Sequence, residues 1–294
     1  MTERLSDISA RIDGIRQLGA VVNAMRGIAA ARAQQARNQL AAVDSYSATI
    51  AFAIGRTLAL VPTARSGNAS RSARLAVVLF CAEQGFAGAF SERVLDAVRA
   101  DLSDSELFLV GTRGRAVAAE EGVIAGWNSP MPSNSLGVPR LADRISEALY
   151  ARIAAGEIDR LDAVFGQWQS GHGIHIERRR LFPLDLSGFP RAGDANTPVL
   201  NLPSETLLIE FTADYVHAQL CKTALHAFAA ENEARMEAMA SARSQIERQL
   251  SMLQATQRTV RQAEITAEII ELAAGETASR SGYALKRSVS KTGP

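Results

Sequence analysis

One stretch of this chain decides the fold: SETLLIEFTADYVHAQLCKTALHAFAAENEARMEAMASARSQIERQLSMLQATQRTVRQAEITAEIIELAA, from Ser204 to Ala274. It contains neither proline nor glycine, the two residues that most often end or weaken a helix. At ~1.5 Å per residue, its roughly 70 residues predict a helix on the order of 100 Å long. A globular domain of this size cannot bury such a helix from end to end, so the helix must pair with another extended element.

A second long helix is predicted near the N-terminus, between Leu5 and about Leu60. Its apolar residues recur at steps of three and four, which places them on one helix face. They are Leu5, Ile8, Ile12, Ile15, Leu18, Val22 and Met25. In the C-terminal stretch, apolar or small residues from Met239 to Val260 follow the a/d rhythm of a coiled coil, interrupted by Gln257. We therefore expect the two helices to form an antiparallel coiled coil.

The segment between these helices has the pattern of a small α/β domain. Short apolar runs with β-branched residues predict strands at Leu75–Cys81, Leu107–Val110, Leu161–Phe165 and His175–Phe182. Helical patterns alternate with them at Glu92–Leu102, Arg113–Glu121 and Leu141–Ala155. This alternation predicts a Rossmann-like domain with a largely parallel sheet.

These patterns divide the chain into five predicted segments. They are an N-terminal coiled-coil helix (1–61), an α/β domain (73–186), a Gly- and Pro-rich linker (187–203), a C-terminal coiled-coil helix (204–278) and a basic tail (279–294). The tail contains no acidic residue, and Gly282 is expected to break the helix there.

Composition excludes several classes of protein. The net charge of +1 gives no overall basic field, so nucleic-acid binding is not implied. Cys81 and Cys221 lie in apolar runs without metal-ligand spacing, which favours buried thiols in a reducing compartment. The N-terminus is charged from the outset, and no apolar run reaches membrane-spanning length. We therefore expect a soluble protein with no direct membrane span.

Catalytic machinery is not evident in the sequence. Glycine never precedes lysine, so the phosphate-binding pattern GxxxxGK[ST] is missing. Gly171 and Gly173 form a GxG that favours a hairpin turn over a dinucleotide loop, because a strand pattern follows it. His172 and His175 share this turn without the ligands of a zinc site. We predict no catalytic, cofactor-binding or metal site, and no enzymatic activity of the chain by itself.

Several motifs resemble those of ATP synthase gamma subunits. AMRGIAAAR, Ala24 to Arg32, is similar to the first-helix signature of that family. ENEARMEAM, Glu231 to Met239, and RQAEITAEIIEL, Arg261 to Leu272, resemble its two C-terminal signatures. AEQGFAGAF, Ala82 to Phe90, resembles the Gly-rich turn that follows the first strand. Departures such as Gly27 and Arg258 indicate a divergent branch, of the kind an alternative bacterial ATP synthase would have.

The resemblance implies that the chain is the central rotor shaft of a rotary ATP synthase, a non-catalytic subunit of an ion-translocating complex. Its coiled coil would stand in a head of alternating alpha and beta subunits. Its α/β foot would bind the epsilon subunit and the c-ring of the membrane sector. Flow of protons or sodium ions through that ring would be coupled to ATP synthesis or hydrolysis, at the cytoplasmic face of a bacterial inner membrane.

The resemblance also implies which residues contact the head. Met25 and Arg26 match the segment that faces the beta subunits, and Arg235 matches a basic position in that neighbourhood. In the family, certain polar positions contact the catch loops of the head. The residues that match them here are Arg261, Gln262, Thr266, Glu268 and Glu271. The alternative for the charged residues is a solvated coiled-coil face, and for Met25 it is packing in the seam.

Two questions stay open at this point. A tether or scaffold, whose α/β domain binds a small ligand, would also have long terminal helices, although it would have no need of RQAEITAEIIEL. The basic tail has two interpretations, a disordered terminus or a segment that contacts acidic groups of the stator and slows ATP hydrolysis.

Overall fold

The structure is a computed structural model that describes residues 5–60, 74–102, 104–189 and 200–289, with side chains described up to Glu276. Two long helices flank the sheet in sequence: α1, Leu5–Leu58, and α5, Ser204–Val289. The chain divides into two compact units, a smaller one of Met1–Ala24 with Ala240–Pro294 and a larger one of Met25–Met239.

The larger unit contains a five-stranded sheet in the order β3-β2-β1-β4-β5. The strands are β1 (Leu75–Phe80), β2 (Ser105–Val110), β3 (Trp127–Ser129), β4 (Arg160–Gln169) and β5 (Gly173–Phe182). The first four are parallel, with Leu75 opposite both Ser105 and Arg160, and β5 pairs antiparallel with β4. The predicted Rossmann-like domain is confirmed. The sequence did not predict β3, because three residues are too short for a strand pattern.

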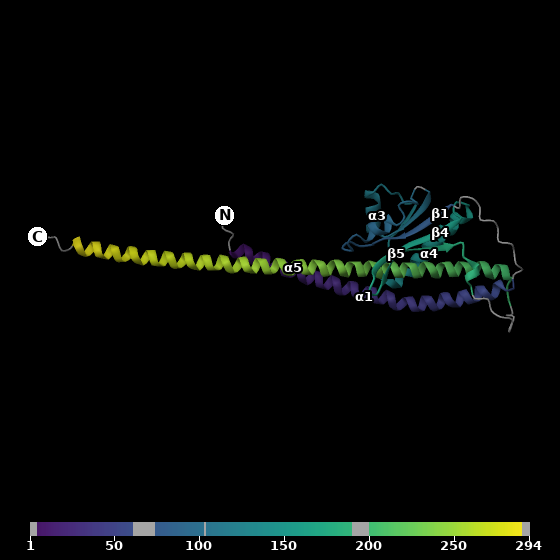
Figure 1. Ribbon diagram of the computed structural model, residues 1–294, viewed down its shortest axis with the longest axis horizontal. Helices are drawn as coiled ribbons and strands as arrows, with labels where there is room; N and C mark the ends of the chain where they lie inside the picture. Colours follow the sequence, from purple (N-terminus) through teal and green to yellow (C-terminus); the bar gives the residue numbers. More distant parts are fainter. Residues whose placement is uncertain (1–4, 61–73, 103, 190–199, 290–294) are drawn as a thin grey trace. The chain divides into compact units, whose positions relative to one another are not determined.

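Helices cover both faces of this sheet (Figure 1). Helices α2 (Phe90–Asp96) and α3 (Thr112–Glu120) pack on one face, whereas α4 (Val138–Ala154) and the early part of α5 pack on the other. Short 3-10 helices lie at Ser135–Gly137 and Leu186–Gly188. Strand β1 is buried on both faces, which explains its uninterrupted apolar run LAVVLF.

In the larger unit, α1 and α5 run antiparallel. The guanidinium of Arg37 pairs with the carboxylate of Glu233, and Lys222 Nζ lies 2.6 Å from Asp44 Oδ1. Residue numbers therefore fall along α5 as they rise along α1. Ala36 is fully buried in the core that this part of α5 shares with the sheet.

In the smaller unit, the same two helices again run antiparallel. Gln257 Nε2 donates to Ser9 Oγ at 2.9 Å, and Arg243 Nη1 donates to Asn23 Oδ1 at 3.4 Å. Gly19 lies between these contacts, where a Cβ would stand 3.4 Å from Ile246 Cγ2. The predicted antiparallel coiled coil is thus confirmed in each unit.

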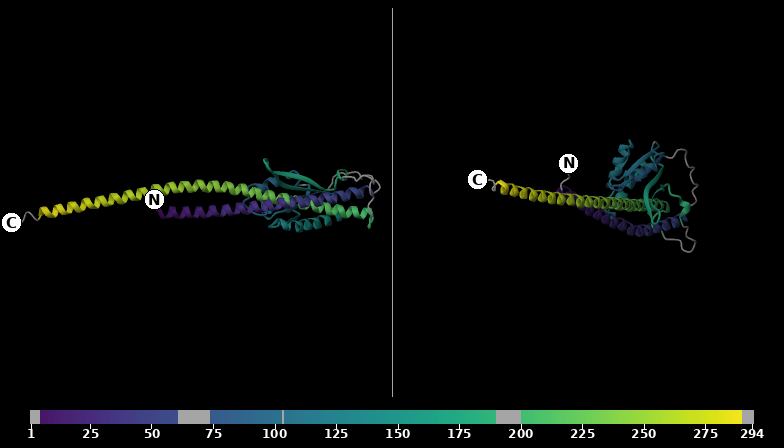
Figure 2. Two further views of the ribbon diagram at one scale, coloured as in Figure 1. Left: turned by 90° about the horizontal axis from the view of Figure 1, so that it is seen from below. Right: turned by 60° about the vertical axis from the view of Figure 1, so that its left-hand side comes forward.

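Helix α5 continues to Val289 without interruption, as Figure 2 shows, so the expected end near residue 278 and the expected break at Gly282 are wrong. One glycine in a helix costs only about 0.5–1 kcal/mol relative to alanine, and good helix formers from Ala284 to Arg287 follow it. Residues 290–294 of the predicted tail and 190–199 of the predicted linker lie outside the described residues.

Candidate partner-contact site

The late part of α5 exposes several of the residues that the sequence predicted as partner contacts. They are Arg261, Gln262, Thr266, Glu268 and Glu271. The hydroxyl of Thr266 donates to the carbonyl of Gln262 at 2.8 Å, a bond within the helix. Every residue from Arg261 to Glu276 is exposed, and we call this segment the exposed stretch of α5.

Large apolar side chains also lie uncovered on the exposed stretch. Ile265, Ile269, Ile270 and Leu272 have exposed fractions between 49% and 74%. Ile265, Ile269 and Leu272 recur at steps of four and three, so they share one face of the helix. Contiguous exposed apolar surface is typical of interaction sites, so this face is a candidate contact surface.

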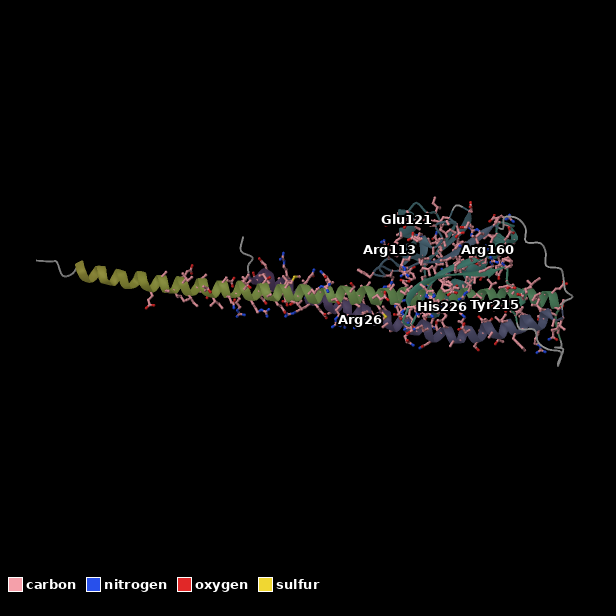
Figure 3. All side chains as sticks on the ribbon, in the orientation of Figure 1. Arg26, Arg113, Glu121, Arg160, Tyr215 and His226 are labelled. Atoms are coloured by element: carbon pink, nitrogen blue, oxygen red, sulfur yellow. The ribbon has the colours of Figure 1, made fainter. Side chains whose placement is uncertain are left out.

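Met25 and Arg26 begin the larger unit on α1, and both side chains are half-buried. Figure 3 shows Arg26 on α1, apart from Arg113 and Arg160 of the sheet domain. The next residue is Gly27. Apart from its chain neighbours and the backbone of its own helix, no described heavy atom lies within 4 Å of the place where a Cβ would stand. This part of α1 therefore keeps a partly open surface.

Arg235 is placed differently from the other predicted contacts, because it is buried and only 5% exposed. Its Nη2 atom donates to Glu231 Oε1 at 2.5 Å and to the Gln84 carbonyl at 3.3 Å, while Nε donates to the Gly85 carbonyl at 3.2 Å. Nη1 donates to Asn232 Oδ1 at 3.0 Å. The guanidinium is thus directed into the chain, toward the turn that follows β1.

Glu231 completes this arrangement and is itself 3% exposed. Its carboxylate accepts from the backbone N–H of Gln84 at 3.2 Å as well as from Arg235. Glutamate four residues before arginine is a helix ion-pair signal that the sequence displays. Which turn the pair would hold could not be predicted, since Gln84 is 147 residues away from Glu231.

Protein side chains lie close to the crevice in which Rossmann-like sheets bind nucleotides. Such a crevice lies at the carboxyl ends of the strands where the strand order reverses, which is between β1 and β4 in this sheet. On β4, a Cβ added to Gly166 would lie 2.7 Å from the ring of Phe90 and 3.2 Å from Ala230 Cβ. Helix α5 therefore lies against β4 at Gly166 and against the turn that follows β1.

The GxG motif forms the connection between β4 and β5, as the sequence predicted. Gly171 and Gly173 have φ angles of +78° and +74°, which residues with a Cβ seldom adopt. His172 lies in this turn and His175 on β5. Across the described ranges, no group of three His, Cys, Asp or Glu side chains could hold a metal ion.

Both cysteines are buried, as predicted. Burial raises the pKa of the Cys81 thiol and of the Cys221 thiol to about 12, so both stay protonated near neutral pH. Cys221 Sγ lies 3.9 Å from His217 Nδ1, a distance too long for a strong hydrogen bond.

Within the part of the chain that the structure describes, no helix combines the length and apolarity needed to cross a membrane.

A Rossmann-like domain flanked in sequence by two long helices, one of which carries an exposed row of apolar side chains, is typical of subunits that assemble with other chains. A family model for ATP synthase matches residues 4–278, and the chain belongs to this family. The ATP synthase gamma chain of Prosthecochloris aestuarii is 26% identical over 290 residues, covering 93% of this chain and 98% of the relative. That of Rhodospirillum rubrum is 26% identical over 300 residues, with 93% and 99% covered.

Solved structures support the same fold. A chain in the Euglena gracilis mitochondrial ATP synthase, in a structure of its OSCP, F1 and c-ring, covers 95% of both chains at 14% identity and a TM-score of 0.59. A chain of the Tetrahymena thermophila central stalk and c-ring covers 76% of this chain and 99% of its own length at 16% identity, with a TM-score of 0.53. The tether or scaffold alternative is not favoured by these relatives.

Proposed function

We propose that this chain is the central rotor shaft, or gamma subunit, of a rotary ATP synthase. It couples ion flow through the c-ring to ATP synthesis or hydrolysis in the catalytic head. The observation that carries this proposal is the family match over residues 4–278, which includes both long helices and the sheet domain. Gamma chains align with the sequence over 98% of their own length, so the likeness is not confined to coiled-coil periodicity.

The helices have the physical properties that a shaft requires. Unbroken helices of 54 and 86 residues satisfy their backbone hydrogen bonds internally and resist bending and twisting. In the larger unit, Ala29, Ala33 and Ala36 of α1 are at most 1% exposed. Such small side chains let a neighbouring helix approach closely, which favours a compact and stiff pair.

The proposed partners are the alpha and beta subunits of the head, the epsilon subunit and the c-ring. The Euglena structure, described as containing F1 and the c-ring, supports this assignment by its likeness of fold. We place the chain peripherally at the cytoplasmic face of a bacterial inner membrane. We also propose that it binds no nucleotide and has no catalytic activity alone; the packing of Phe90 and Ala230 beside Gly166 supports this.

Head contacts are assigned to the surfaces that the structure leaves open. The exposed stretch of α5, which carries the apolar row Ile265, Ile269 and Leu272, also supplies Arg261, Gln262, Thr266, Glu268 and Glu271. The half-buried pair Met25 and Arg26 contributes from α1. Arg235 is buried, so we propose that it acts through the turn that it holds and not as an exposed contact.

Reconstitution tests this proposal. The purified chain is mixed with alpha and beta subunits from the same organism, and ATP hydrolysis is measured after size-exclusion chromatography. We expect the chain to co-elute with the head subunits and support turnover, whereas the chain alone should give none. A variant truncated after Val260, which lacks the exposed stretch, is the matched control and should assemble less well. Failure of the intact chain to co-elute, or turnover by the chain alone after head complexes are removed, would falsify the proposal.

A further inference from the structure

The turn between β1 and α2 is held from two sides. On α5, Arg235 donates to the carbonyls of Gln84 and Gly85, and Glu231 accepts from the Gln84 N–H. On α1, Arg32 Nη1 lies 3.5 Å from the side-chain oxygen of Gln84. Side chains of α5 therefore bond the N–H and carbonyl of Gln84 and the carbonyl of Gly85, whereas α1 bonds the Gln84 side chain.

Phe86, at the tip of this turn, has an unusual conformation. Its φ angle is +62°, and no other non-glycine residue among those described has a positive φ. The left-handed region costs a residue with a Cβ about 1–2 kcal/mol, so surrounding contacts must hold it there. Phe86 is nevertheless 68% exposed, so packing of its own side chain does not account for this φ angle.

We call Glu231 and Arg235, with their hydrogen bonds to the turn, the clamp. Both side chains are buried, which makes their arrangement rigid. Glu231 and Arg235 are 3% and 5% exposed, and each has its partner within 2.5 Å. A buried ion pair whose donors and acceptors are matched has one low-energy geometry, because any movement leaves a buried charge without its partner. The backbone of Gln84 and Gly85 is tied to this rigid pair.

We propose that Glu231 and Arg235 are positioning residues that hold the β1–α2 turn so that Phe86 is presented to the catalytic head. Arg235 then influences head binding through Phe86 and not by touching the head itself. This inference rests on the proposed function, because it names which part of this chain meets the head in the region of Arg235.

The first experiment measures the clamp in the isolated chain. Amide hydrogen exchange at Gln84 should become about tenfold faster in Glu231→Ala, which removes the acceptor of that N–H. Glu231→Gln retains an acceptor oxygen and should give a smaller increase. The amide of Val78, inside β1, reports the fold and should exchange as in the wild type. Unchanged exchange at Gln84 in Glu231→Ala would overturn the clamp.

The second experiment is a double-mutant cycle on binding to the assembled alpha and beta head. We expect Phe86→Ala and Arg235→Ala each to lower the affinity for the head about tenfold. The double variant should bind only about tenfold to thirtyfold more weakly than the wild type. Direct contact of Arg235 with the head would instead make the effects multiply, to about a hundredfold. Such multiplication, or wild-type binding by Phe86→Ala, would overturn the inference.

Controls keep this test interpretable. Arg243→Ala removes another arginine of α5, which pairs with Glu247 at 2.8 Å, and should leave the exchange of Gln84 unchanged. If Arg235→Ala does not fold, the cycle is run with the near-isosteric Glu231→Gln in its place, with the same expected non-additivity. A wild-type chain that does not bind the head contradicts the proposed function itself, and the exchange experiment then still decides the clamp.

Discussion

The side-chain amide of Gln257 on α5 donates to the hydroxyl oxygen of Ser9 on α1 at 2.9 Å, and that hydroxyl donates in turn to the carbonyl of Leu5 at 2.9 Å. The neighbouring seam positions Ile8 and Ile12 are at most 3% exposed. Gln257 interrupts the apolar rhythm of its helix, and the structure tolerates it because Ser9 accepts a hydrogen bond from its amide. A polar pair within an apolar seam fixes the register of the two helices.

We expect Gln257→Ala to lower the free energy of unfolding by about 0.5–1.5 kcal/mol, since one hydrogen bond is lost. Ser9→Ala should have a similar effect, and the double variant should lose little more than either single one. Urea unfolding followed by circular dichroism measures all three. Gln262→Ala, on the exposed stretch, is the control and should stay within about 0.5 kcal/mol of wild type. Additive losses in the double variant would show that the two side chains do not act as a pair.

Gly14 offers a stabilising substitution in α1. A Cβ there would meet no described atom within 4 Å beyond its own helix backbone and chain neighbours, and the residue lines a groove with Leu18, Met252 and Leu253. Gly14→Ala should therefore raise the free energy of unfolding by about 0.5–1 kcal/mol through helix propensity. Gly166→Ala should lower it by about 1–3 kcal/mol, because the new methyl group meets Phe90 at 2.7 Å. Thermal unfolding of the two variants should shift in opposite directions, and a common direction would contradict this assignment.

His226, labelled in Figure 3, should make the stability of the chain depend on pH. Burial, with Arg179 and Lys222 nearby, lowers the pKa of its imidazole from 6.5 to about 4, and the ring stacks on Phe165 at a centroid distance of 5.9 Å. Between pH 6.5 and pH 4 the unfolded chain binds a proton that the folded chain does not. The free energy of unfolding therefore falls as pH falls through this window, whereas above pH 6.5 this group contributes no pH dependence.

Allowing for the partial exposure of the ring, this loss should amount to about 1–2 kcal/mol. Urea unfolding at intervals from pH 7 to pH 4 measures it. His226→Phe and His226→Gln cannot titrate, so both should have a flatter profile than wild type across this window. Identical slopes in wild type and both variants would mean that other groups cause the dependence.

Arg261 and Gln262 should matter for assembly and not for folding. Replacing both with alanine keeps α5 intact, because alanine is the better helix former and both side chains are exposed. Charge-assisted hydrogen bonds to a partner contribute about 1.5–3 kcal/mol each, so the affinity for the head should fall at least tenfold. Binding measured by titration of labelled chain, with unchanged circular dichroism as the control for folding, checks this. Unchanged affinity and unchanged coupled ATP synthesis would assign both residues to solvated surface.

Truncation after Ala278 tests the basic end of the chain. The helix continues to Val289, so the basic residues beyond 278 extend a regular element. We expect the truncated chain to assemble normally and its complex to hydrolyse ATP faster at low salt, by about twofold to fivefold. A few exposed ion pairs of about 0.2–1 kcal/mol each would account for this braking. The difference should vanish at high salt, where such pairs are screened. Equal rates at low salt would exclude the brake.

Local patterns in the sequence were sufficient for the architecture. The absence of proline and glycine from Ser204 to Ala274, and the stripe that begins at Leu5, predicted both long helices because helix formation depends on neighbours a turn away. Strands β1, β2 and β4 were predicted from uninterrupted apolar runs, which burial on both faces requires, whereas the edge strand β5 is mostly not buried. The predicted contacts from Arg261 to Glu271 came instead from the resemblance of RQAEITAEIIEL to a family signature. Their binding to the head remains a prediction.

Contacts between residues far apart in the chain were decided only by the tertiary structure. The sequence placed Arg235 at a partner surface, yet folding brings Gln84 and Gly85, about 150 residues away, against its guanidinium. In the sequence, Gln257 only interrupts the apolar pattern of its helix; the structure shows that it bonds to Ser9. Helical periodicity determines which residues share a face, but the partner of that face depends on how distant segments pack. Sequence alone therefore gave the helices and the family resemblance, whereas tertiary packing decided which charged side chains are buried as clamps and which are left for other chains.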